Sequence, residues 1–103
     1  MSDMLGPRKY ESAKLELRYT QALPYELRQL VREVFNVKTD DDKIGLGYGT
    51  HLMHQVCDEA DKYKKVLLLI PDSGKLETWY SKFGFNKVQD KPVVLMIRNP
   101  KGL

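Results

Sequence analysis

The sequence has a single cysteine, no long apolar run and no apolar segment near its first residue. One cysteine, Cys57, cannot form an internal disulfide, which is typical of a protein from a reducing compartment. No run approaches the ~20 apolar residues that a membrane-spanning helix needs, and the first residues lack the apolar core of a secretory signal. We therefore expect a cytoplasmic protein with no membrane partner.

Charge of one sign is not in strong excess either. The 103 residues are 42% hydrophobic and 30% charged, with a net charge of +3, as expected for a globular protein with one modest core. The small positive charge permits anionic ligands but does not by itself indicate nucleic acid. The basic run at Lys62, Lys64 and Lys65 lacks the aromatic pattern of known nucleic-acid platforms. Association with nucleic acid is therefore the weakest of the functions that this sequence allows.

Metal ligands are few as well. His51 and His54 are three residues apart on an expected helix, so they could face one metal ion. No cysteine or carboxylate cluster completes a ligand set. We expect both histidines at the surface or in a groove, and we expect no metal cofactor.

The most distinctive stretch is residues 43–53, Lys-Ile-Gly-Leu-Gly-Tyr-Gly-Thr-His-Leu-Met. Glycines alternate with apolar residues there, and from Thr50 onward the apolar residues recur at helical spacing. The first N–H groups of a helix lack internal partners, and the helix dipole adds positive potential, so such a stretch suits a phosphate group. The alternative is a flexible glycine turn before an ordinary amphipathic helix. A P-loop is excluded because no lysine follows Gly49 before the helix begins, and the spacing of the glycines excludes the dinucleotide-binding fingerprint.

The remaining chain predicts a small α/β domain over residues 14–103, after a loose or docked tail at 1–13. Alternation predicts a strand at 14–20, and an apolar stripe predicts a helix at 24–36; a strand at 29–37, rich in valine, is the alternative. A helix from Thr50 should end near Tyr63. Further on, we expect a buried strand at 65–70 in a parallel sheet, a turn at 71–74, a short helix at 76–83 ended by Gly84, and a hairpin of strands at 85–88 and 92–98.

The sequence resembles the GNAT superfamily of N-acetyltransferases in two motifs, which follow one another along the chain as they do in that family. Residues 44–49 occupy the six positions of that family's pyrophosphate loop, and a helix follows. Residues 76–85, Leu-Glu-Thr-Trp-Tyr-Ser-Lys-Phe-Gly-Phe, resemble its apolar helix with an aromatic-Tyr pair and a Gly-Phe that opens the next strand. Ser73 falls where many members carry Asn. The resemblance covers most of residues 14–98.

The resemblance implies a mixed β-sheet with flanking helices and specific site residues. The loop would bind the pyrophosphate of acetyl-coenzyme A (acetyl-CoA), and the pantetheine arm would lie between two splayed strands, one of them at 66–70. Tyr80 would be the general acid that protonates the leaving thiolate, although packing alone also explains a tyrosine there. The cofactor-binding residues would be Gly45, Leu46, Gly47, Tyr48, Gly49, Thr50 and Ser73.

The sequence departs from the family pattern in two places. Ile44 stands where the family has Arg or Gln, and only residues 37–43 separate the expected first helix from the glycine loop, which is too short for the usual preceding strand. Either residues 29–37 are that strand, or a partner chain supplies strands, or the protein is a shortened relative without catalysis.

The expected function is therefore transfer of an acetyl group from acetyl-CoA to an amine of a small molecule or protein. The alternative is a catalytically inactive GNAT-like module that binds a CoA species or a protein partner. Since a short chain of this kind can leave a sheet edge open, we also expect a homodimer, with the strand near Val93–Ile97 at its interface.

Overall fold

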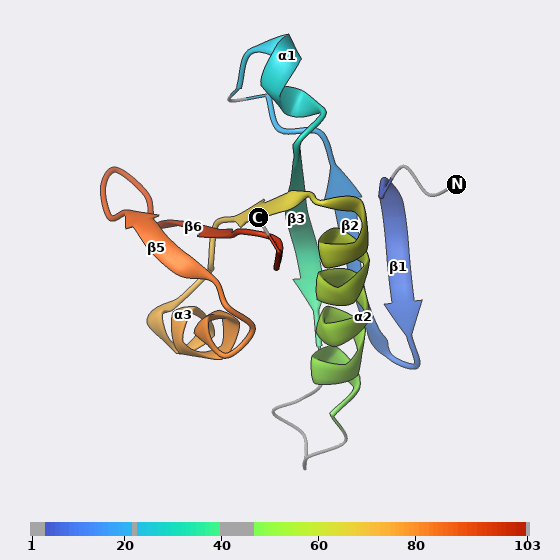
Figure 1. The fold of residues 1–103 in the computed structure, drawn as a ribbon. Helices are drawn as coiled ribbons and strands as arrows, with labels where there is room; N and C mark the ends of the chain where they lie inside the picture. The colour runs from blue at the N-terminus through green and yellow to red at the C-terminus, as the bar shows by residue number, and fades with distance from the viewer. Residues whose placement is uncertain (1–3, 22, 40–46, 103) are drawn as a thin grey trace.

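The computed structural model describes residues 4–21, 23–39 and 47–102 of the chain. Figure 1 shows the elements in order. They are β1 (Gly6–Tyr10), β2 (Ala13–Arg18), α1 (Tyr25–Arg28), β3 (Val31–Lys38), α2 (Tyr48–Tyr63), β4 (Val66–Leu69), α3 (Gly74–Ser81), β5 (Asn86–Gln89) and β6 (Leu95–Arg98).

The strands form one mixed sheet with the order β1-β2-β3-β4-β6-β5. Strands β3 and β4 run parallel and are joined through helix α2, whereas the other neighbouring pairs are antiparallel. A parallel pair needs a crossover connection, and a helix packed on one face of the sheet is the usual one. The α/β class and the mixed sheet expected from the sequence are confirmed.

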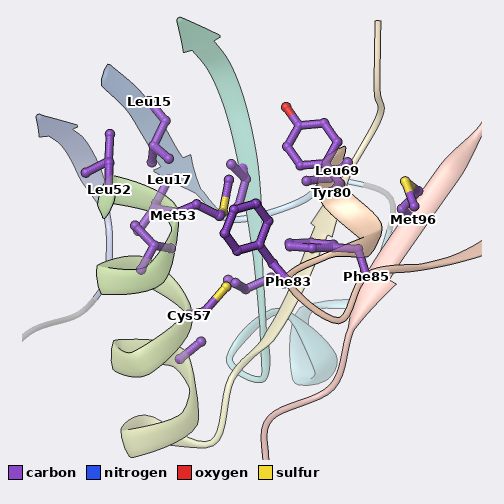
Figure 2. Packing of buried hydrophobic residues seen from close by; sticks show 14 of the residues in the cluster. Leu15, Leu17, Leu52, Met53, Cys57, Leu69, Tyr80, Phe83, Phe85 and Met96 are labelled. Atoms are coloured by element: carbon purple, nitrogen blue, oxygen red, sulfur yellow. The ribbon is translucent and has the colours of Figure 1, made fainter. Parts of the chain in front are cut away.

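Helix α2 packs its apolar face on the sheet, as its periodicity predicts. Buried residues of α2, including Leu52, Met53 and Cys57, lie in one cluster with Leu15 and Leu17 of β2 and with Leu69 of β4. Figure 2 shows this cluster continuing to Tyr80, Phe83 and Phe85, from α3 and the segment that follows it. The ring centroids of His54 and Phe83 are 5.0 Å apart, so α2 contacts the segment that follows α3.

The helix predicted at 24–36 is wrong over most of its length. Only Tyr25–Arg28 is helical, and Val31–Lys38 is strand β3, so the alternative strand at 29–37 is confirmed. Valines every third residue fit a helical stripe, but their β-branched side chains favour an extended backbone when strands are available on both sides. Strand β3 has such neighbours, β2 and β4.

Two further expectations change. Residues 6–10, expected within a loose or docked tail, form β1 and pair with β2 from Gly6 opposite Leu17 to Tyr10 opposite Ala13. The open edge expected near Val93–Ile97 is also wrong, because β6 pairs with β4 on one side and β5 on the other. In the described part of the chain, the outer strands of the sheet are β1 and β5.

An ion pair ties the C-terminal strand to the end of α2. Nη1 and Nη2 of Arg98 donate to the two carboxylate oxygens of Asp61 at 2.8 and 3.1 Å. Its Nε donates to the carbonyl oxygen of Phe83 at 2.7 Å. The Arg98 side chain is 6% exposed, so its charge depends on these partners. The hydrogen bonds from Arg98 are the main cause that lowers the pKa of Asp61.

We predict that Asp61→Asn lowers the free energy of unfolding at neutral pH by about 3 kcal/mol, because it leaves a buried guanidinium without its counter-charge. The folded-state pKa of Asp61 is lowered, so this stabilisation is present above the ordinary carboxyl range and is lost as the pH falls through the folded pKa. Urea denaturation at pH 7 and pH 3 measures both effects. The control is Asp58→Asn, an exposed carboxylate on the same helix; equal costs for the two variants would contradict the assignment.

Candidate functional site

The central parallel pair of strands separates partway along its length. Strand β3 pairs with β4 only from Val31 opposite Val66 to Glu33 opposite Leu68. Strand β3 then continues to Lys38, while β4 ends at Leu69. The second half of β3 therefore has β2 as its neighbour on one edge and a gap on the other.

A β-bulge in β3 accompanies this separation. Lys14 lies opposite Lys38 and Glu16 lies opposite Phe35, so three steps along β3 match two along β2. Asn36 sits in the extra step with φ of 51°, in the left-handed region that asparagine tolerates better than most residues. Its Nδ2 donates to Oε2 of Glu16 at 2.6 Å. Bulges bend a strand, and this bend falls where β3 and β4 part.

A cavity of about 300 Å³ occupies the gap. Residues 33–38 of β3 form one wall, and Ile70 and Asp72, which follow β4, contribute to another. Tyr80 of α3 completes the lining. The cavity therefore lies at the carboxyl ends of two parallel strands, which is where open α/β sheets commonly bind ligands.

Tyr80 presents its hydroxyl to this cavity from a buried ring. The residue is 3% exposed and packs against Trp79 and Phe85, with centroid distances of 5.2 and 5.8 Å. Figure 2 shows its oxygen pointing away from the apolar cluster. No residue in the described ranges hydrogen-bonds this oxygen. Every fully buried polar side-chain atom in those ranges does have a hydrogen-bond partner. The oxygen of Tyr80 is therefore not fully buried, and it is open to the cavity that the residue lines. Burial, with the charge of Asp72, raises the pKa of Tyr80 to about 12.

The two carboxylates that line the cavity differ in their environment. Oε2 of Glu33 is 2.8 Å from Nη2 of Arg18 and is held in an ion pair. Asp72 is exposed and has no ion pair with any described residue. Asp72 is therefore the carboxylate available to a cationic group that enters beside Tyr80.

Helix α2 begins at the end of the sheet where β3 ends (Figure 1). Gly47 precedes the helix with φ of 70°, a left-handed conformation that favours glycine, and its carbonyl oxygen accepts from the N–H of His51 at 2.9 Å. Tyr48, Gly49 and Thr50 form the first turn, and Gly49 is buried. The predicted loop residues Gly45 and Leu46 lie outside the described residues.

Ser73, also predicted from the resemblance, caps helix α3. Its Oγ accepts from the backbone N–H of Leu76 at 3.3 Å, which is the usual role of serine before a helix. Ser73 does not line the cavity that contains Tyr80. Its predicted contact with coenzyme A stays a prediction.

Sequence reasoning missed Glu33 and Asn36 as cavity residues because it placed residues 24–36 in a helix, and it missed Lys38 because it placed that residue in the loop after the helix. Asp72 was assigned to a turn without a role. The one usable signal was the alternative strand at 29–37, since its carboxyl end would have placed these residues beside Tyr80.

In the described ranges, no group of three or more His, Cys, Asp or Glu side chains could hold a metal ion, and none of the described helices is long and apolar enough to cross a membrane.

No protein-family model and no curated protein sequence matches the chain, but solved structures do. The chain is similar to PH1933 from Pyrococcus horikoshii OT3, with 26% identity, TM-score 0.65, and coverage of 84% of this chain and 57% of that one. It is also similar to YhbS of Escherichia coli, a GNAT family N-acetyltransferase in complex with CoA, with 12% identity, TM-score 0.61, and coverage of 84% and 51%.

N-acetylglutamate synthase from Neisseria gonorrhoeae, complexed with coenzyme A and L-arginine, matches with 16% identity and TM-score 0.59, over 86% of this chain and 22% of that one. The chain thus spans little more than half the length of PH1933 and YhbS. These likenesses establish a GNAT N-acyltransferase fold, and the resemblance identified in the sequence is confirmed at that level.

We predict that the free energy of unfolding falls as pH rises from 10 towards 12, and that Tyr80→Phe removes part of this fall. The phenol ionises near 10 when unfolded but near 12 when folded, so the unfolded state binds fewer protons between these values. Urea denaturation of both proteins at pH 8, 10 and 11 measures the slope. Parallel slopes for wild type and variant would show that the ring is not buried as described.

Proposed function

We propose that this chain, which has the GNAT fold, transfers an acetyl group from acetyl-CoA to an amine of a small molecule or protein. The observation that carries the proposal is the cavity between β3 and β4, into which the hydroxyl of Tyr80 points. A hydroxyl without a partner in the described protein, on a rigid buried ring, is suited to give a proton to a group bound in the cavity.

The edge of β3 that faces the gap supports the binding of an extended amide chain. Beyond Glu33, no strand of the described ranges pairs with that edge of β3, and unpaired strand edges bind extended chains through main-chain hydrogen bonds. The pantetheine arm of coenzyme A is such a chain. We propose that it lies along residues 34–38, with its thioester near Tyr80.

The start of α2 is the proposed site for the pyrophosphate. The left-handed Gly47 opens a helix of 16 residues, and helix N-termini favour anions. The proposed binding residues in the described ranges are Gly47, Tyr48, Gly49, Thr50 and Ser73. Gly45 and Leu46, which lie outside those ranges, are proposed with them.

In the proposed reaction, the acceptor amine attacks the thioester carbon and forms the C–N bond of a tetrahedral intermediate, losing a proton to solvent. The C–S bond breaks as this intermediate collapses, and Tyr80 donates its proton to the departing sulfur and regains one from solvent. Its raised pKa keeps the phenol protonated across the physiological range. Metal is not part of this scheme. We further propose that the chain forms one GNAT-like domain, is cytoplasmic and forms a homodimer; within the described residues, the outer strands β1 and β5 offer edges for pairing.

We predict that Gly47→Val weakens binding of coenzyme A about tenfold or more, because a side chain there obstructs close approach to the helix start. Gly6→Val is the matched control: Gly6 also has a left-handed φ, of 88°, and at both glycines an added Cβ meets nothing within 4 Å. Both variants should lose about 1–2 kcal/mol of stability from backbone strain. Calorimetric titration with coenzyme A and thermal melting separate the effects; equal affinities in the two variants would remove the helix start from the site.

We predict that Tyr80→Phe lowers kcat by roughly a hundred- to ten-thousand-fold, the usual contribution of a general acid. Affinity for acetyl-CoA and thermal stability should change little, since no described residue loses a hydrogen bond. Release of free thiol from acetyl-CoA across a panel of amines measures the rate. A variant as fast as wild type would disprove the role of Tyr80. If wild type binds coenzyme A but acetylates no amine in the panel, the chain is the inactive binding module.

A further inference from the structure

A second cavity, of about 330 Å³, adjoins the one that contains Tyr80. It is lined by residues of β1, β2 and β3, and it shares Asn36 and Lys38 with the first cavity. The two cavities therefore meet at the same short piece of β3, the bulge. Asn36 and Lys38 therefore belong to the lining of both cavities.

Three lysines stand in one row across the strands beside this cavity. Lys9 of β1 lies opposite Lys14 of β2, and Lys14 lies opposite Lys38 of β3. Residues directly opposite in a sheet share a face, and like charges there repel one another. The lysines' side of the sheet is the one away from α2, because Leu15 and Leu17, which alternate with Lys14, are buried with that helix.

No described acid neutralises this row. None of the three lysines forms an ion pair with a described residue. The one carboxylate that lines the second cavity, Glu16, accepts a hydrogen bond from Asn36 at 2.6 Å. Among the described residues that line the second cavity, Lys14 and Lys38 carry positive charge and only Glu16 carries negative charge, so positive charge is in excess there.

The bulge is what brings the second lysine to the cavity. Glu16 lies opposite Phe35, so a regular ladder would place Val37 opposite Lys14. The extra residue, with Asn36 in the left-handed region, places Lys38 there instead. The backbone conformation that accompanies the opening between β3 and β4 therefore also places Lys14 and Lys38 directly opposite each other.

We propose that Lys14 and Lys38 bind an anionic group of the acceptor, a carboxylate or a phosphate, so that the acceptor is an amine that also carries an acidic group. This inference rests on the proposed acetyl transfer. The acceptor's ammonium lies beside Asp72 in the cavity with Tyr80, and its acidic group lies beside the lysines in the adjoining cavity. Oppositely charged protein groups thus orient the two ends of one small molecule.

The experiment compares wild type with Lys14→Gln and Lys38→Gln, using acceptors matched in length. The series consists of unbranched ω-amino acids, the corresponding alkylamines without the acid, and aminoalkyl phosphates. Wild type should prefer the acidic amines in kcat/KM, and each variant should raise the acceptor KM about tenfold with little change in kcat. Lys62→Gln, which removes one charge in the last turn of α2, is the control and should behave as wild type.

Acetyl-CoA titrations show whether the lysines act on the other substrate. Unchanged affinity for acetyl-CoA in Lys14→Gln and Lys38→Gln supports the acceptor site. Weakened affinity for acetyl-CoA with an unchanged acceptor KM would overturn it and assign the lysines to the phosphates of coenzyme A. The relative kcat/KM of carboxylates and phosphates identifies the acidic group.

A binding measurement keeps the test independent of turnover. Amide chemical shifts at Lys14 and Lys38 should move on titration of wild type with the acidic amines, and should not move with the matched alkylamines. If these shifts occur without catalysis, the anion site stands and the proposed acetyl transfer fails. If coenzyme A binds but no acid perturbs these amides, the charges are compensated within the chain and the anion site is disproved.

Discussion

Strand β3 pairs with β4 over three residues and then runs on without it, and the candidate site depends on this loss of pairing. Main-chain groups on an unpaired strand edge need partners, from water or from a ligand. The sheet tolerates the gap because β2 still pairs with the far end of β3, where Lys14 faces Lys38. Asn36 provides the bend, in a conformation that few residues other than glycine adopt easily.

The elements around the gap are joined to one another by buried contacts. Helix α2 packs its Leu52 and Met53 into a core that also holds Val34 of β3 and Leu69 of β4, so the strands on either side of the gap share one support. Helix α3 brings Tyr80 to the cavity by packing its ring against Phe85. The ion pair between Arg98 and Asp61 joins the C-terminal strand to the end of α2. The geometry of the candidate site is thus set by helices, strands and buried contacts.

The sequence predicted the parts of the fold that have a local signature. Helix α2 has a clear apolar stripe, and the buried run before Pro71 identifies β4. The Tyr80 segment with Gly84 carries a specific family pattern. The prediction from sequence failed at residues 24–36, because valines spaced by three fit a helix as well as a strand. Only the neighbouring strands decide between the two. Cavity residues such as Lys38 and Asp72 were missed for the same reason, since a bulge and a gap depend on neighbouring strands far away in the sequence.

Hydrogen–deuterium exchange with and without saturating coenzyme A tests the central claim most directly. If the gap beside β3 is the binding site, amides at 34–38 and at the start of α2, residues 48–51, should both exchange more slowly in the complex, because the ligand takes the place of the missing strand and covers the helix start. Unchanged exchange at 34–38 in a protein shown by calorimetry to be saturated, with protection confined to other elements, would contradict the account.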